Sequence, residues 1–317
     1  MTVATTAACG GSDGGDASGG GADEMTEMTL GYVPYTGDAP LFLGIEQGIY
    51  EEHGIDLTTT PAQAPAAVIA SLVNGEQQIG FTTTITLIAA VANGTDVRCV
   101  TPVDGRSDPS PDVDYTGLMV TADSPIQSAA DLEGKKVGVV GLGSLNHLFV
   151  MEEMSDAGAD PGAAEFVQIP FPQLQAALEQ GRVDAVVATA PFSAQILAAG
   201  NRGVAWQERT FIPEGQGTCF AASGEYIEES PEEVQKFIDA HSAALEYAAD
   251  HVDEALAQLP KFLDMTPEQA AKAETGSIYT PELNIESIQM IQEHMVKHGF
   301  LDETLPMESI VYTPADS

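Results

Sequence analysis

The chain has 317 residues, with 11 Lys and Arg against 48 Asp and Glu, for a formal net charge of −37 at pH 7. A surface this acidic repels nucleic acid and anionic lipid, which excludes both as partners, and it indicates either adaptation to solubility or salt or one specific cationic partner. With 44% hydrophobic residues the chain is long enough for two domains with separate cores, and it has no apolar run of about 18 residues that would span a membrane.

Residues 1–27 have the composition of a targeting signal followed by a flexible tether. Small residues lead up to Cys9, and a tract of Gly, Ser and Asp follows it. This pattern resembles the end of a bacterial lipoprotein signal, in which the cysteine is lipidated. The charged start and apolar stretch that normally precede such a cysteine are missing, which indicates a shortened sequence or a misplaced start codon. We expect lipidation at Cys9 and a flexible acidic linker after it, rather than a tail with a chance cysteine.

From Thr29 onward, short apolar runs alternate with segments of helical periodicity. The predicted strands are 29–33, 55–59, 78–81 and 97–103, and the predicted helices are 40–52, 62–74 and 85–93. Gly75 and Gly94 follow the last two helices, where a glycine commonly ends a helix. Strands separated by such helices predict a parallel, three-layer α/β sheet.

Two irregular segments interrupt the alternation, one at 104–114 and one near 207–216. A second α/β set lies between them, with predicted strands 136–140, 165–169 and 185–188 and predicted helices 145–157, 173–180 and 192–199. After it come a strand, 219–223, and helices that include 231–251. A chain that leaves one lobe, builds another and returns predicts lobe 1 from residues 28–115 plus 213–317 and lobe 2 from residues 116–212. Two crossovers would form the hinge, with a ligand cleft between the lobes.

Three segments resemble the motifs of one protein family. Residues 41–57 resemble its opening helix and turn, residues 131–139 (DLEGKKVGV) its entry to the second lobe, and residues 177–184 its A-L, G-x-x-D lead-in to a strand. In this order, over residues 30–256, they resemble the periplasmic binding proteins of nitrate, sulfonate and taurine importers, a group that includes the NMT1/THI5-like binders of thiamine pyrimidine precursors. The resemblance implies the two-lobed, type II periplasmic-binding-protein fold, each lobe being a parallel-rich sheet flanked by helices.

The resemblance also implies a function. Such a protein is the extracytoplasmic, lipid-anchored solute-binding component of an ABC importer. It traps a small molecule between hinged lobes and docks on a membrane permease as a monomer, without catalysis or a cofactor. Two positions depart from the family pattern: Gln78 replaces an Asp, and Ala190 precedes Pro191 where an acidic residue is common. That acid faces the cleft in relatives, so its loss argues against a cationic or pyrimidine-type ligand.

Two other classes share the fold or its two-lobed plan. Pyrimidine-precursor synthases resemble this chain, but they consume a histidine and carry a cysteine cluster, whereas this chain has only Cys9, Cys99 and Cys219. The effector domain of a transcription regulator would need an N-terminal helix-turn-helix, which residues 1–28 cannot form. We therefore prefer a binding protein, with a binder of thiamine pyrimidine precursors as the alternative and a synthase after it.

Ligands of open α/β sheets bind beyond the carboxyl ends of strands, where helix N-termini present N–H groups to an anion. Four segments of this chain fit that description. The candidate residues are Tyr35, Thr36, Asp38 and Ala39; Thr82, Thr83 and Thr84; Gly143, Ser144, Asn146 and His147; and Pro191 and Phe192. They predict a small organic anion, a sulfonate or carboxylate with an apolar or aromatic body. The alternatives are helix capping by the threonines, core packing of the rings of Tyr35 and Phe192, and an outward orientation of His147.

Other patterns do not indicate catalytic or metal sites. Ser144 lacks the flanking glycines of a nucleophile elbow, and Asn146 occupies the third glycine position of a dinucleotide-binding loop. His294 and His298 lie four residues apart without the adjacent Glu of a zinc motif, and we expect them on a solvated helix face.

Two pairs of residues leave alternatives open. Arg106 and Arg209 lie in or near the crossovers, where they either reach the cleft or pair with surface carboxylates. Cys99 and Cys219 are expected on neighbouring strands, as a disulfide or as buried free thiols.

Overall fold

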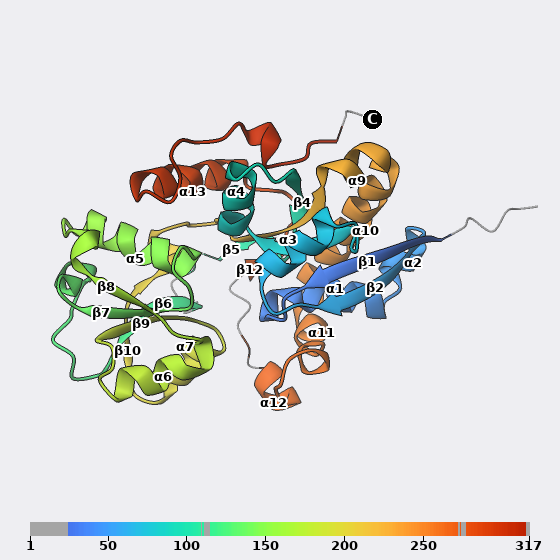
Figure 1. Ribbon diagram of the computed structural model, residues 1–317. Helices are drawn as coiled ribbons and strands as arrows, with labels where there is room; N and C mark the ends of the chain where they lie inside the picture. The colour runs from blue at the N-terminus through green and yellow to red at the C-terminus, as the bar shows by residue number, and fades with distance from the viewer. Residues whose placement is uncertain (1–24, 109, 111–114, 272, 274–276, 315–317) are drawn as a thin grey trace, which may run out of the picture.

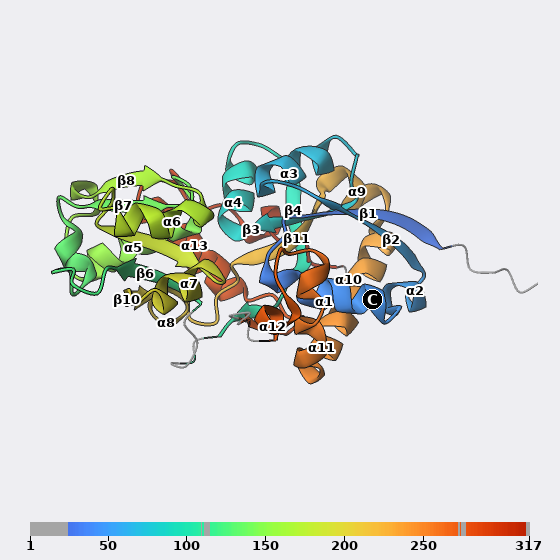
Figure 2. The same ribbon diagram turned by 90° about the horizontal axis from the view of Figure 1, so that it is seen from below.

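The computed structural model describes residues 25–108, 110, 115–271, 273 and 277–314, which form two lobes (Figure 1). Each lobe is built on a five-stranded sheet with helices packed against it. Seen from below, the lobes lie side by side, with lobe 2 in green and lobe 1 in blue and orange (Figure 2). The predicted lipidation site, Cys9, lies outside the described residues. The first strand begins at Thr26, so the end of the predicted tether belongs to the folded part.

The lobe 1 sheet has the strand order β2-β1-β3-β11-β4. Its strands are β1 (Thr26–Tyr32), β2 (Ile55–Pro61), β3 (Ile79–Thr83), β4 (Val97–Pro102) and β11 (Thr218–Ser223). β1 pairs in parallel with β2 and β3, whereas β11 is antiparallel to both β3 and β4. The prediction of a parallel sheet is therefore wrong at β11, because the chain returning from lobe 2 enters the sheet at the end where β3 and β4 finish.

Helices cover both faces of this sheet, because successive strand residues point to opposite sides. Cys99 and Ala221 share a core with residues of α3 and α4, whereas Val100 and Phe220 share one with residues of α1, α2 and α10. These helices are α1 (Ala39–Glu46), α2 (Ile49–Glu52), α3 (Pro65–Val73), α4 (Thr84–Ala92) and α10 (Pro231–Asp250). The helix predicted at 40–52 is thus two helices, since Gly48 has φ +74° and ends the first.

The lobe 2 sheet has the strand order β10-β6-β9-β7-β8. Its strands are β6 (Thr116–Val120), β7 (Lys136–Val139), β8 (Glu165–Gln168), β9 (Ala185–Thr189) and β10 (Arg202–Trp206). β7 is parallel to β8 and β9, and the antiparallel strands are β6, paired with β9, and β10, paired with β6. The sequence patterns did not predict β6 and β10. The first follows an irregular segment with no helix before it, and the second is a half-buried edge strand with a short apolar run.

The helices of lobe 2 also cover opposite faces of the sheet. On β9, Ala185 and Val187 share a core with residues of α5 (Leu145–Asp156), while Val186 and Ala188 share one with residues of α6 (Phe171–Glu179) and α7 (Phe192–Ala198). In Figure 1, α6 and α7 lie below the lobe 2 sheet and α5 above it.

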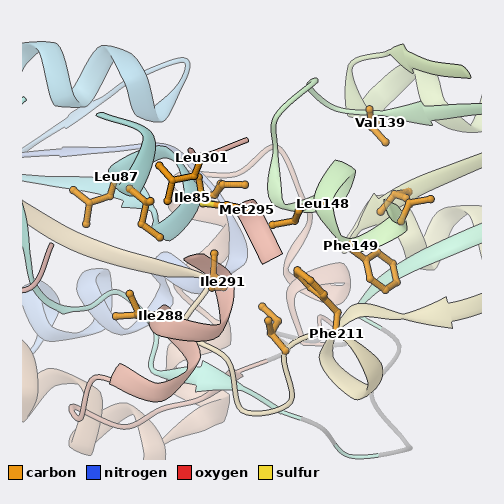
Figure 3. Packing of buried hydrophobic residues seen from close by; sticks show 14 of the residues in the cluster. Ile85, Leu87, Val139, Leu148, Phe149, Phe211, Ile288, Ile291, Met295 and Leu301 are labelled. Atoms are coloured by element: carbon orange, nitrogen blue, oxygen red, sulfur yellow. The ribbon is translucent and has the colours of Figure 1, made fainter. Parts of the chain in front are cut away.

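Helix α13 (Ile285–Lys297) joins the two lobes on the α5 side. Figure 3 shows Ile291 and Met295 of α13 between Ile85 of lobe 1 and Phe149 of lobe 2, and Ile288 of the same helix on the lobe 1 side. One apolar core thus runs from α4 through α13 to α5. The proposed lobe boundaries, 28–115 plus 213–317 and 116–212, assign α13 to lobe 1. This core ties the lobes together along α13, on the α5 side of lobe 2.

A two-stranded sheet includes part of the first crossover. Its strands are β5 (Arg106–Ser107), in the first crossover, and β12 (Ser277–Ile278), which pair antiparallel. Gly105, just before β5, has φ +88°, and a Cβ atom there would lie 2.1 Å from the backbone oxygen of Ile278. The positive φ and the lack of space for a Cβ atom each require glycine at this position.

Cys99 of β4 and Cys219 of β11 are buried free thiols in the structure, the simpler of the two expectations for this pair. Burial, followed by the neighbouring Cys219 thiol, raises the pKa of Cys99 well above its usual range. A thiol with so high a pKa is a poor nucleophile, so Cys99 acts as a small apolar core residue.

Candidate functional site

The carboxyl ends of the parallel strands of the two lobes face each other. Crossover 1 leaves β4 after Pro102 and enters β6 at Thr116, and crossover 2 leaves β10 after Trp206 and enters β11 at Thr218. Thr218 pairs with Thr83 at the end of β3, and Thr116 pairs with Thr189 at the end of β9. Both crossovers therefore join these two sheet edges, which we call the lobe 1 edge and the lobe 2 edge.

Direct contacts confirm that the edges meet. The hydroxyl of Thr36, on the lobe 1 edge, is hydrogen-bonded to the hydroxyl of Tyr115, which precedes β6, at 2.9 Å. In crossover 2, the Gly217 carbonyl accepts a hydrogen bond from the Thr84 amide, at 3.0 Å, and a Cβ atom at Gly217 would lie 3.8 Å from Leu145 Cδ2. Thr84 and Leu145 are the first residues of α4 and α5. Two helix N-termini from opposite lobes thus lie beside the same glycine.

The lobe 1 edge holds a buried cluster of carboxyl and hydroxyl groups. Asp104 accepts hydrogen bonds from Thr218, at 2.9 Å, and from Ser277 of β12, at 2.6 Å, and the Tyr35 hydroxyl is 3.2 Å from that of Thr218. A Cβ atom at Gly37 would lie 2.3 Å from both Asp104 Oδ2 and the Tyr35 hydroxyl, so this glycine permits the close approach. Burial raises the pKa of Asp104.

Asp38 completes this cluster with one unused acceptor. Its Oδ2 atom accepts the Tyr35 amide proton at 3.2 Å, but Oδ1 is buried and has no hydrogen-bond partner. Burial raises the pKa of the Asp38 carboxyl well above its usual range, and burial, followed by the charge of Asp104, does the same to the pKa of Tyr35. The neighbouring Ala39 is fully buried as the first residue of α1.

The three consecutive threonines have different environments. Thr82 and Thr84 are buried, and their hydroxyls donate to backbone carbonyls of Thr83 and Gln216. Thr83 is half-buried and caps α4, with its hydroxyl accepting the Thr86 amide proton at 3.3 Å. The capping alternative thus describes Thr83, and it is the threonine of the three with the most exposure at the lobe 1 edge.

The lobe 2 edge presents the loop between β7 and α5. Ser144 caps α5 by accepting the His147 amide proton at 3.3 Å. Asn146 is 9% exposed, and its Nδ2 donor is buried without a hydrogen-bond partner. His147 Nδ1 accepts the Gly143 amide proton at 3.0 Å, and its ring packs against Phe166 at 4.2 Å between centroids. The contacts of His147 therefore hold the loop in place.

Burial, followed by the charge of His298, lowers the pKa of His147 to about 4. The imidazole is thus neutral at pH 7, and its Nδ1 remains free to accept from Gly143.

The other predicted residues of the lobe 2 edge, Pro191 and Phe192, are half-buried at the start of α7. Nearby, the Tyr115 carbonyl accepts hydrogen bonds from Ser193 Oγ, at 2.8 Å, and from the Ala190 amide, at 3.0 Å. Tyr115 therefore ties α7 to crossover 1.

Two residues of the crossovers were not predicted as part of this region. Tyr115 itself is buried and contacts both edges. Glu208 is 2% exposed in crossover 2, accepts the Thr116 amide proton at 3.2 Å, and has its pKa raised by burial to about 7. Neither lies at a helix N-terminus after a parallel strand, so no pattern of strand ends in the sequence predicts them.

The two arginines of the crossovers have partners of their own. Arg106 forms an ion pair with Glu214 at 2.9 Å, and Arg209 lies over the Trp206 ring, 5.5 Å from its centroid. Arg106 also lines a shallow hollow of about 450 Å³ with residues 280 and 282–284. This hollow is not lined by any of the predicted site residues.

The prediction of a solvated face for His294 and His298 is wrong. Glu152 of α5 is buried and is approached by His298 Nε2 at 2.6 Å, Lys297 Nζ at 2.6 Å and His294 Nδ1 at 3.2 Å. Burial alone would raise the pKa of Glu152, but hydrogen bonds from Lys297 and His298 outweigh it, and the pKa is lowered. The histidines face lobe 2, and this charged cluster fixes the end of α13 to α5.

Within the described part of the chain, no group of three or more His, Cys, Asp or Glu side chains is arranged to hold a metal ion. The helices of the same residues include none with the length and apolar character needed to cross a membrane.

Residues 36–255 match the family model described as NMT1/THI5 like, which spans both facing edges. The chain belongs to the NMT1/THI5-like family. The resemblance found over residues 30–256 is thereby confirmed.

Relatives of this NMT1/THI5-like protein include both binding proteins and enzymes. It is 26% identical to a formylaminopyrimidine-binding protein of Halalkalibacterium halodurans, over 74% of this chain and 69% of that protein. It is also 26% identical to a 4-amino-5-hydroxymethyl-2-methylpyrimidine phosphate synthase of Aspergillus parasiticus, over 77% of this chain and 71% of that one.

Among solved structures, the periplasmic aliphatic sulphonate binding protein SsuA from Escherichia coli superposes on this NMT1/THI5-like protein with a TM-score of 0.74, at 20% identity, over 90% of this chain and 97% of that one. The two-lobed periplasmic-binding-protein fold predicted from the sequence is confirmed.

Proposed function

We propose that this chain is the extracytoplasmic solute-binding protein of an ABC importer and that it binds a small organic molecule between the facing edges. The observation that carries the proposal is the meeting of the α4 and α5 N-termini, from opposite lobes, beside Gly217. Two lobes joined by crossovers at their facing edges are the arrangement in which hinge motion encloses a ligand. Lipidation at Cys9, docking on a permease and a monomeric state belong to the same proposal.

The first candidate ligand is a small organic anion, a sulfonate or carboxylate with an apolar body. Helix N-termini carry partial positive charge and N–H donors, and they stabilise anions. The unpartnered Nδ2 donor of Asn146 lies in the first turn of α5, where it adds to these donors. The charge of −37 over the whole chain acts weakly on such a site, because physiological salt screens exposed charges beyond about 8 Å.

The second candidate ligand is an aminopyrimidine, which one observation favours. Carboxyl groups of Asp38, Asp104 and Glu208 are buried near the facing edges, and Asp38 Oδ1 has no donor. Such acceptors suit a ligand with amino groups, and the relative from Halalkalibacterium halodurans is a formylaminopyrimidine-binding protein. Arg106 and Arg209 are engaged by Glu214 and Trp206, which weakens the case for an anion.

A catalytic role is not part of the proposal. The chain is similar to a pyrimidine phosphate synthase, and the resemblance to this class implies a histidine that the enzyme itself consumes. His147, at the lobe 2 edge, has its ring engaged with Gly143 and Phe166, and His241, beside the end of β4, is fully buried. The two described cysteines, Cys99 and Cys219, are free thiols buried in the lobe 1 core.

Calorimetric titration of the purified chain tests the proposal. The probes are benzenesulfonate, propanesulfonate and benzoate as anions, and 4-amino-2-methylpyrimidine. Two variants separate the candidates. Asn146→Ala removes a hydrogen-bond donor and should weaken the binding of an anion. Asp38→Asn keeps the acceptor for the Tyr35 amide but removes the acid. It should weaken the binding of an aminopyrimidine and leave an anion at least as tightly bound.

Binding of an anion that Asn146→Ala weakens supports the first candidate. Binding of the aminopyrimidine alone, weakened by Asp38→Asn, overturns the first candidate in favour of the second. If none of the four probes binds and native mass spectrometry finds no small molecule carried through purification, the proposed function is wrong.

A further inference from the structure

Two phenylalanine rings form a stack on the lobe 2 edge. Phe171 is the first residue of α6, just after β8, and Phe192 is the first residue of α7, just after β9. Their ring centroids are 5.4 Å apart, and the ring planes differ by 4°. Both side chains are half-buried, although each begins a helix whose inner residues are fully covered. The pair therefore lies at the rim of the core and not within it.

The position of Phe171 follows from the apolar stripe of α6. The buried residues of this helix, Leu174, Ala177 and Leu178, share a core with residues of β9, and Phe171 continues the same stripe one turn earlier. At that turn β8 has already ended, at Gln168. The Phe171 ring therefore lies against Phe192 at the lobe 2 edge, on the margin of the core formed with α6 and α7.

A second observation shows that this edge carries uncovered apolar surface. Leu142, in the loop after β7, is 60% exposed, the highest value among the exposed large hydrophobic residues of the described chain. It belongs to the same edge as Phe171 and Phe192, because β7, β8 and β9 run parallel and their carboxyl ends lie at the same edge of the sheet. Exposed apolar groups grouped at one edge are typical of a surface that binds an apolar partner.

We propose that Phe171, backed by Phe192, is a specificity-determining residue that contacts the body of the ligand and selects a flat ring over a saturated one. This inference rests on the proposed function and adds to it the shape of the ligand. Parallel rings present a flat face on which a further ring stacks, and aromatic pairs gain about 0.5–1.5 kcal/mol beyond the area they bury. A saturated ring of similar size covers the same area without that gain.

The test compares ligands that differ only in the ring. Benzenesulfonate is titrated against cyclohexanesulfonate, and benzoate against cyclohexanecarboxylate, with wild-type protein and with Phe171→Leu and Phe171→Tyr. Phe166→Leu is the matched control, because Phe166 is a half-buried ring of the same lobe that packs on His147 and the α5 side. Thermal unfolding followed by circular dichroism shows that each variant is folded, and Phe171→Tyr keeps the ring where Phe171→Leu removes it.

We expect Phe171→Leu to weaken binding of the aromatic ligand of each pair about fivefold to tenfold, because a stacked ring is lost. The saturated member should change by less than about twofold, and Phe171→Tyr and Phe166→Leu should keep the wild-type preference. Equal weakening of both members, or no change in either, overturns the inference while the proposed function stands. If wild-type protein binds neither member of either pair, the anion proposal fails, and this inference fails with it.

Discussion

The buried histidine of lobe 1 gives a quantitative test of the packing described above. His241 of α10 is fully buried, with Nε2 at 2.9 Å from the Val103 carbonyl and Nδ1 at 2.7 Å from the Tyr50 hydroxyl. A carbonyl only accepts, so Nε2 carries the proton and Nδ1 accepts from Tyr50. This neutral imidazole joins α10 and α2 to the end of β4, just before crossover 1.

The magnitude follows from the pKa of His241. Burial lowers this pKa from 6.5 to about 4 in the folded chain. The unfolded chain therefore binds a proton that the folded chain rejects between these two values, and stability present above pH 6.5 is lost as the pH falls toward 4. A gap of about 2.5 pH units corresponds to about 3 kcal/mol of unfolding free energy.

Replacement of His241 by Gln removes the titration. At pH 7.5 we expect His241→Gln to be less stable than wild type by about 2 kcal/mol, because a buried hydrogen bond is lost. At pH 4 the variant should match or exceed wild type, since wild type alone must then protonate a buried ring or lose its stability. The measurement is urea unfolding at a series of pH values. Far-UV circular dichroism is the suitable probe, because the single tryptophan, Trp206, reports on lobe 2.

Tyr50→Phe is the control for this experiment. It removes the hydroxyl that donates to Nδ1 and costs about 1 kcal/mol, but it retains the buried imidazole and so the same dependence on pH as wild type. A stability difference between wild type and His241→Gln that stays constant from pH 7.5 to pH 4 would refute the reasoning.

Three further outcomes follow from the structure. Glu152→Gln should lower the unfolding free energy by about 2–3 kcal/mol in urea titrations at pH 7, since it removes the charge that Lys297 and His298 contact; an unchanged value would contradict the fixed position of α13. Glu208→Gln should gain stability relative to wild type as pH rises from 5 to 8, by up to about 3 kcal/mol, because only wild type must ionise a buried carboxyl whose pKa is about 7; a difference independent of pH would contradict that burial. Asn146→Ala should weaken an anionic ligand about tenfold in calorimetry without lowering the melting temperature, as its Nδ2 atom has no partner to lose; weakened folding with intact binding would assign it to the core instead.

Elements with strong local patterns could be predicted from the sequence. Helices α3 and α4 end just before Gly75 and Gly94, as the sequence patterns indicated, and both glycines have positive φ. Strands β6 and β10 could not be predicted, because β6 follows an irregular segment and β10 is a short, half-buried edge strand that pairs only with β6. The antiparallel direction of β11 could not be predicted either, since it depends on where the chain returns from lobe 2.

The candidate site was predictable to the extent that it depends on strand ends. Tyr35, Thr83, Ser144 and Phe192 could be placed at the facing edges because helix N-termini after parallel strands meet there. Burial could not be predicted in the same way: Asp38 is a polar residue whose environment is set by residues more than 60 positions away, such as Asp104.

The same limit explains the error at α13. His294 and His298 have no acidic partner of suitable geometry on their own helix, and Glu152, which they contact, is about 140 residues earlier in the chain. Phe171 was missed for a related reason, because its partner Phe192 belongs to another helix.

Hydrogen–deuterium exchange of the free protein and of the protein saturated with whichever probe binds in calorimetry tests the central claim most directly. If the ligand lies between the facing edges, its binding slows exchange in peptides that cover residues 35–39, 82–84, 143–147 and 189–193, in both lobes at once. Slowed exchange confined to one lobe, or to the hollow beside Arg106, would contradict a site formed by the two edges.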